Sequence, residues 1–210
     1  TWFVHEDIAM DHAAVGELAT YFATTAAQGD TFNVRETLRK LLKSEFFYDP
    51  QYRYRMFKNP ADFMASALRS LEIDESSWSS SVFTFMRDMG MTLFEPPNVA
   101  GWIQGERWIN SSNLIARFNY GDRVSGTSRM GDAYVDDLLA NGALTGMDDH
   151  AGMIEYFRGR LIHEPLTGDE SQPLMDFLTG FNNTISTTTF RAKIRGLAHL
   201  FLTMPRYQLK

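Results

Sequence analysis

The order of apolar and polar residues along the chain predicts helices almost throughout. Apolar residues recur every three or four positions, and capping or turn residues interrupt the recurrence where a helix would end. Val34, Leu38 and Leu41, for example, fall on one helical face, whereas Arg35 and Lys40 fall elsewhere. We therefore expect an all-α protein, an irregular bundle of about 8–9 helices with one long loop rich in proline and tryptophan.

Capping residues predict where these helices begin and end. Gly29 is expected to end the first helix, Asn59 to begin the third, and residues 74–77 to cap the fourth. Thr167 and Glu170 have the spacing of a capping box. The fourth helix is so apolar that we expect it to be the buried axis of the fold. The predicted apolar faces lie within residues 14–22, 34–46, 63–71, 78–89, 114–118, 135–139, 153–161, 174–178 and 190–202.

The helical pattern fails between residues 91 and 109. Pro96 and Pro97 are adjacent and exclude a helix there, and Trp102 and Trp108 add two large rings. Such a segment can be a rigid plug over the helix core, because aromatic rings bury large areas and paired prolines restrict the backbone. It can equally line a groove for a sugar ring, a peptide or a partner helix, because indole faces suit stacking. The composition favours the plug.

Length and composition describe a globular chain of 210 residues, 44% of them apolar. We expect a single helical domain over residues 1–210, with a weak subdomain boundary near residues 124–131, where serine, glycine and threonine are frequent. The absence of cysteine excludes zinc ribbons, iron–sulfur clusters and thiol nucleophiles. A net charge of −6 without clustered basic residues argues against nucleic acid, and no apolar run is long enough to span a membrane.

Few residues suggest catalysis or metal binding. His5, Asp11 and His12 could attract a metal ion, but their spacing matches no zinc-enzyme motif, and a solvated acidic segment explains them better. His150 and His199 stand alone, without a serine or acid at a recognised catalytic spacing. No nucleophile elbow, phosphate-binding loop or dinucleotide fingerprint occurs. We therefore predict neither a metal nor a cofactor.

The alternative is a hydrolase whose site surrounds the loop. Glu95, Asn98 and Arg107 could form it with Arg117, if the tryptophans raise the pKa of Glu95 so that it acts as a general acid. In a structural interpretation, Glu95 caps a turn and Arg117 holds the loop through backbone carbonyls, as arginine commonly does; this interpretation is favoured. An open cleft holding Glu95, Arg107 and Arg117 would favour chemistry, and Arg117 buried against carbonyls would favour a scaffold.

Several segments resemble one known family, the domain of unknown function 1800. The longest is Met-Gly-Met-Thr-Leu-Phe-Glu-Pro-Pro-Asn-Val-Ala-Gly-Trp at residues 89–102, and the others bring the resemblance to nearly all 210 residues. Those others are residues 42–47, Lys58-Asn59-Pro60, residues 108–114, Arg117-Phe118-Asn119 and Met204-Pro205-Arg206-Tyr207-Gln208.

The resemblance implies a bacterial protein that is exported, either to the periplasm or outside the cell. It implies no reaction, because the family has no established one. Its members are usually about twice as long, so we expect this chain to match only the C-terminal half of the family's domain. Partners implied in this way are the missing N-terminal half and a sulfatase-like protein encoded nearby; a polysaccharide is also possible.

Together these observations favour a non-catalytic helical scaffold or interaction module that binds a protein or polysaccharide partner through residues 93–108, which we name the 93–108 loop. We expect the loop to pin the helices as well as to offer this surface. The candidate binding residues are Phe94, Glu95, Pro96, Pro97, Asn98, Gly101, Trp102, Arg107, Trp108 and Arg117.

Overall fold

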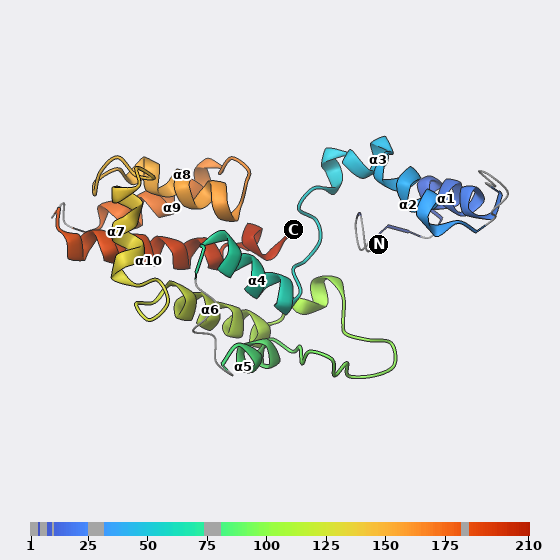
Figure 1. Cartoon of the computed structure of the whole chain (residues 1–210), viewed down its shortest axis with the longest axis horizontal. Coiled ribbons are helices and arrows are strands. Elements are labelled where there is room, and N and C mark those ends of the chain that lie inside the picture. Colours follow the sequence, from blue (N-terminus) through green and yellow to red (C-terminus); the bar gives the residue numbers. More distant parts are fainter. Residues whose placement is uncertain (1–3, 5–7, 10, 25–31, 74–80, 182–184) are drawn as a thin grey trace. The chain divides into compact units, whose positions relative to one another are not determined.

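The computed structural model describes residues 4, 8–9, 11–24, 32–73, 81–181 and 185–210. These residues form ten α-helices, one of them only four residues long, and no β-strand is found among them, which confirms the all-α prediction. The chain divides into two compact units. The smaller unit comprises residues 1–57 with Lys210, and the larger unit comprises residues 58–209 (Figure 1).

The smaller unit consists of short helices with little buried surface. Asn33 caps the second helix by accepting a hydrogen bond from the backbone N–H of Glu36, and the ring of His12 lies 5.1 Å from that of Phe46. Among the described residues of this unit only Val4 is buried. The elements are α1 (Ala13–Thr24), α2 (Val34–Leu42), α3 (Glu45–Tyr48) and the short 3-10 helix η2 (Pro50–Tyr52).

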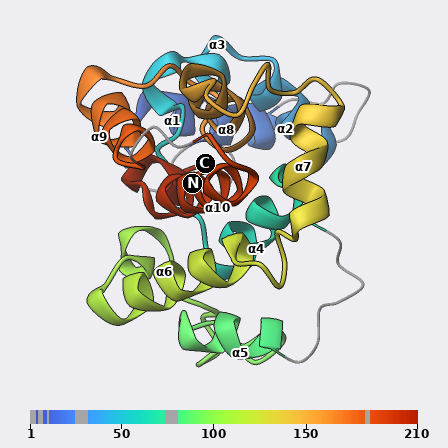
Figure 2. The same ribbon diagram turned by 90° about the vertical axis from the view of Figure 1, so that its left-hand side faces the viewer.

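The larger unit is organised around its longest helix. Figure 2 shows α10 with α6, α7, α8 and α9 around it, and α10 packs against each of these four helices. The elements are α4 (Pro60–Ser70), α5 (Ser81–Asp88), η4 (Gly105–Trp108), α6 (Ser111–Ser125), α7 (Asp132–Ala140), α8 (His150–Leu161), α9 (Gly168–Thr179), α10 (Thr187–Thr203) and η5 (Pro205–Gln208).

The prediction that residues 78–89 form the buried axis is wrong for the part that the structure describes. Helix α5 packs on α6 and α4, but Phe83 on its outer side is 63% exposed. The centre is α10, whose buried face includes Phe190, Ile194, Leu197 and Phe201. Its 17 residues provide a longer continuous apolar face than the eight residues of α5, two of which, Arg87 and Asp88, are charged.

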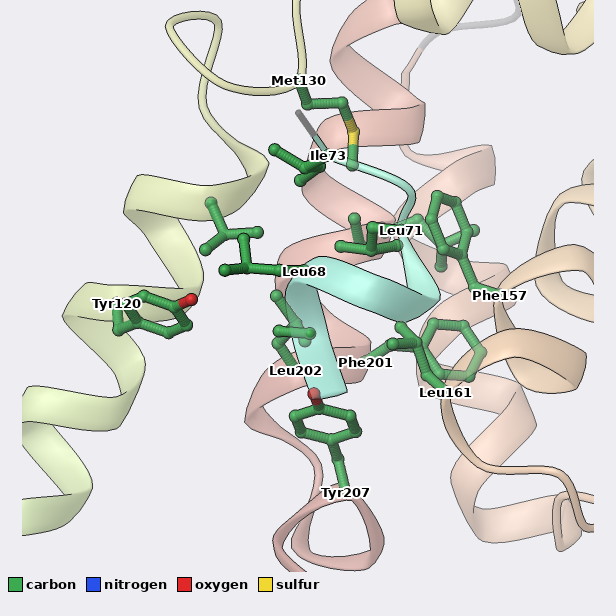
Figure 3. Packing of buried hydrophobic residues seen from close by; sticks show 14 of the residues in the cluster. Leu68, Leu71, Ile73, Tyr120, Met130, Phe157, Leu161, Phe201, Leu202 and Tyr207 are labelled. Carbon is green, nitrogen blue, oxygen red and sulfur yellow. The ribbon is translucent and has the colours of Figure 1, made fainter. Parts of the chain in front are cut away.

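The buried face of α4 joins α8 and α10 in the core. Figure 3 shows Leu71 at the end of α4 together with Phe157 and Leu161 of α8 and Phe201 of α10. The rings of Phe157 and Phe201 have their centroids 6.0 Å apart. Burial of these large apolar side chains is the main force that holds the larger unit together.

Local capping chemistry explains several helix ends. Asn59 accepts a hydrogen bond from the backbone of Asp62 at the start of α4, and the capping box of Thr167 and Glu170 is present at α9, so both predictions are confirmed. Helix α5 ends at Gly90 in a left-handed conformation with φ of +87°, and the next N–H, of Met91, donates to the carbonyl of Met86 at 3.0 Å. This pattern is a Schellman motif, which needs the positive φ that glycine tolerates.

Some sequence-based expectations fall on residues outside the described part of the chain. These are the possible metal ligand His5, the helix end at Gly29, and the cap at residues 74–77. Residues 124–131 lie inside the larger unit, and the division between the units falls between residues 57 and 58. The expectation of a single domain with a weak boundary near residues 124–131 stays a prediction.

Candidate functional site

The 93–108 loop lies between α5 and α6 of the larger unit and is fixed at both ends. Met91, which precedes it, is buried, and Trp108 at its end is only 3% exposed. The amide nitrogen of Asn113 donates to the carbonyl of Trp108 at 3.4 Å, and a Cβ on Gly90 would lie 3.5 Å from the same nitrogen. In Figure 1 the loop is the green segment that connects α5 to α6.

The middle of the loop is exposed. Phe94 is 92% exposed, Val99 is fully exposed, and Pro96 and Pro97 also face solvent. The prediction of a rigid plug over the core is therefore wrong for residues 94–100. A high content of aromatic residues and proline is compatible with a packed loop and with a projecting one. Because helix α5 is short, the middle of the loop lies beyond the surface of the core.

Local turns give the exposed part its shape. The side chain of Asn98 accepts a hydrogen bond from the backbone N–H of Ala100 at 2.8 Å, and the N–H of Gly101 donates to the carbonyl of Asn98 at 3.1 Å. Gly101 has a φ of +91°, a conformation that glycine adopts without strain. Phe94 has a φ of +65°, which is uncommon for an aromatic residue and is typical of functional or tightly constrained positions.

The two tryptophans belong to the support of the loop. Trp108 lies in the core, and Trp102 is half-buried and packs against it. The two indoles therefore do not form the pair of open stacking faces expected of a sugar-binding groove. Besides its prolines, the large apolar side chains that the loop presents to solvent are Phe94, Val99 and Ile103.

Arg117 on α6 lies away from this exposed surface. Its side chain is 1% exposed, and its two terminal nitrogens donate to the carbonyl of Lys58 at 2.7 Å and to the side-chain oxygen of Gln208 at 3.0 Å. Its guanidinium carbon lies 4.8 Å from the centre of the Phe63 ring. Burial lowers the pKa of Arg117 to about 10, and the neighbouring Tyr207 acts weakly in the opposite direction.

The groups around Arg117 tie three distant segments together. The hydroxyl of Tyr207 lies 2.9 Å from that of Ser66, and burial raises the pKa of Tyr207. The ammonium of Lys58 lies 3.5 Å from the centre of the Tyr207 ring, and the N–H of Lys58 donates to the carbonyl of Gln208 at 2.8 Å. We name Lys58, Phe63, Arg117, Tyr207 and Gln208 the arginine cluster; it joins the start of α4 to α6 and η5.

The residues of the hydrolase hypothesis are not brought together. Glu95, Asn98 and Arg107 are exposed, whereas Arg117 is buried and bound to a backbone carbonyl, as the structural interpretation expected of it. The acceptor is the carbonyl of Lys58 and not one in the loop. Within the described ranges no three histidine or acidic side chains are grouped as ligands for a metal ion.

The arginine cluster was not predicted from the sequence. Lys58, Arg117, Tyr207 and Gln208 each lie in a segment on which the family resemblance rests, and this was the one available signal. Nothing in their spacing indicates that they meet, because Arg117 is 59 residues from Lys58 and 91 residues from Gln208.

The fold and these contacts define an all-helical protein in which one loop projects apolar side chains and a buried arginine, away from the loop, links α6 to Lys58 and Gln208. The chain belongs to the DUF1800 family: the family described as "Protein of unknown function (DUF1800)" matches residues 1–209. Comparisons with curated proteins and with solved structures gave no match. None of the helices that the structure describes is long and apolar enough to cross a bilayer.

Proposed function

We propose that the protein is a non-catalytic interaction module of an exported bacterial protein, and that it binds a protein partner through the 93–108 loop. The observation that carries the proposal is the exposure of Phe94 and Val99 on a segment anchored at Met91 and Trp108. Large apolar side chains that face solvent on a supported loop are typical anchors of protein interfaces.

The contacts that anchor the loop favour binding, because the loop needs little further ordering when a partner associates. The turn at Asn98 and the burial of Trp108 restrict the loop before any partner arrives. A segment held in this way loses less conformational entropy on binding than a free one.

A protein partner fits the loop better than a polysaccharide. Sugar rings are commonly held on open indole faces, but Trp108 is buried and Trp102 is half-buried. The exposed groups Phe94, Val99 and Ile103 are purely apolar and match an apolar pocket in a protein. The burial of Arg117 against the carbonyl of Lys58 supports a scaffold, because it removes one of the four side chains of the hydrolase hypothesis.

Site-specific cross-linking in the producing bacterium tests this proposal with the complete natural protein. A photoreactive phenylalanine analogue is placed at Phe94 and, in a matched control, at Ile185, which is 66% exposed outside the loop. The partner identified by cross-linking is then purified, and its affinity for the natural protein and for the Phe94→Ser, Val99→Ser and Ile185→Ser variants is measured by titration. We expect Phe94→Ser to weaken binding about 30-fold, as for a central interface residue, and Ile185→Ser to change it less than about twofold.

Three results would contradict the proposal. One is equal cross-linking from positions 94 and 185, and another is an affinity that the Phe94→Ser change leaves intact. The third is binding of a purified polysaccharide that Phe94→Ser abolishes, which would replace the protein partner by a glycan. The exported location rests on family resemblance alone, and cell fractionation that finds the protein in the cytoplasm would refute it.

A further inference from the structure

A buried lysine on α10 has a histidine as its side-chain partner. Lys193 is 5% exposed and lies on the same face of α10 as Phe190, Ile194 and Leu197. Its ammonium nitrogen is 2.7 Å from Nε2 of His150 on α8. In the described part of the chain no carboxylate forms an ion pair with it. A buried ammonium usually faces a carboxylate, so this pairing is unusual.

The contact fixes the protonation state of the histidine. An ammonium group can only donate hydrogen bonds, so Nε2 of His150 must accept and the imidazole must be neutral, with its proton on Nδ1. A second proton on the ring would place two positive charges 2.7 Å apart in a partly buried position. The contact and a protonated His150 therefore exclude each other.

We propose that the contact between His150 and Lys193 is a pH-sensitive latch between α8 and α10, which opens when His150 takes up a proton. The latch lies outside the 93–108 loop and does not depend on the function proposed for that loop. His150 is the first residue of α8, so its release acts directly on the end of that helix.

Burial and the charged groups around His150 shift its pKa in opposite directions. Burial is the largest effect and lowers the pKa of His150, and Lys193 from α10 lowers it further. Asp148 and Asp149, which precede α8, raise it but are the weaker influence. Asp149 is already engaged by Thr145 and by the backbone of Gly152. Helices α4 and α9 also pack on α8, and their described residues add no charged group to these influences.

The lowered pKa of His150 determines how the stability of the fold changes with pH. A histidine whose pKa is lower in the folded than in the unfolded protein takes up its proton more readily after unfolding. Its neutral form stabilises the fold fully above the ordinary histidine pKa of 6.5, and this contribution is lost as the pH falls below 6.5. The latch is therefore closed at neutral pH and opens as the pH falls below 6.5 and His150 takes up its proton.

Nuclear magnetic resonance of the histidine rings tests the latch in the full chain. We expect His150 to titrate with a pKa below 6.5, and we expect Lys193→Met to raise that pKa part of the way back, since burial remains. A pKa of 6.5 or above in the natural protein, or no change on Lys193→Met, would overturn the proposal. His150→Gln assigns the signal and retains an acceptor for Lys193.

Hydrogen exchange shows whether the helix responds. Below the pKa that magnetic resonance gives for His150, amides of α8 should exchange about threefold or more faster in the natural protein than in His150→Gln, and at about pH 7.5 the two should agree. His163→Gln is the matched control, because His163 is exposed, and it should behave as the natural protein does. Equal protection in the natural protein and His150→Gln at both pH values would refute the opening of α8.

Discussion

Replacement of Arg117 tests whether the arginine cluster stabilises the fold by packing or by charge. Arg117→Met removes the guanidinium but keeps an unbranched apolar stem of similar length to that of arginine. It leaves the carbonyl of Lys58 and the side-chain oxygen of Gln208 without their donors, and each such loss costs about 2 kcal/mol. Against this, the lowered pKa of about 10 shows that burial of the charge itself costs about 3 kcal/mol, which the variant regains.

These opposing effects leave a net destabilisation of about 1 kcal/mol for Arg117→Met. Arg117→Ala also loses the two methylene groups beyond Cβ, at about 0.8 kcal/mol each, so we expect about 3 kcal/mol. The difference between the two variants isolates the packing of the stem, because both lack the charge and both lose the two hydrogen bonds.

Urea unfolding followed by tryptophan fluorescence measures both changes, since Trp102 and Trp108 lie in the larger unit. The two variants should unfold with the slope of the natural protein and with midpoints in the order natural, Arg117→Met, Arg117→Ala. Equal destabilisation of the two variants would refute the packing argument. An Arg117→Met protein more stable than the natural one would show that charge burial outweighs both hydrogen bonds.

Two further predictions concern helix ends and glycines. Gly159→Ala in α8 should raise the free energy of unfolding by about 1 kcal/mol, because a Cβ there meets no atom within 4 Å. Gly90→Ala should lower it by at least about 1 kcal/mol, because the φ of Gly90 is +87°. Thermal unfolding that moves both variants in one direction would contradict this prediction. Asp149→Ala should destabilise α8 by about 1 kcal/mol at neutral pH, because the carboxylate caps the N–H of Gly152 at 2.8 Å. The pKa of Asp149 is lowered, chiefly by its hydrogen bond from Thr145, so its contribution to stability is present above pH 3.8 and lost below it. The difference in stability between Asp149→Ala and the natural protein should therefore shrink on acidification, and a difference that grows would contradict the prediction.

Local chemistry made much of the fold predictable. Asn59, Thr167 and Gly90 act within one helical turn, so their roles follow from neighbouring residues. The inward faces of α4 and α10 follow equally from apolar spacing. The position of α5 did not follow, because apolar spacing indicates which side of a helix is buried but not how far that helix lies from the centre.

The candidate site was less predictable because its contacts are long-range. That Arg117 would bind a backbone carbonyl follows from its chemistry, but the identity of the acceptor depends on how α4 and α6 pack. The contact between His150 and Lys193 spans 43 residues and leaves no trace in spacing. Phe94 is exposed because the packed core does not extend as far as this residue, and an aromatic residue in the sequence does not indicate how far the core extends.

The arginine cluster also constrains when the larger unit is completed during synthesis. Arg117 leaves the ribosome 91 residues ahead of Gln208, so α6 is made long before one of the two acceptors of its buried guanidinium exists; the other, the carbonyl of Lys58, is made earlier. Until η5 emerges, one terminal nitrogen of Arg117 has water in place of Gln208, and the core around the guanidinium stays incomplete. The nascent larger unit is therefore expected to stay open until residues 205–208 have left the exit tunnel, and to rely on chaperones during that interval.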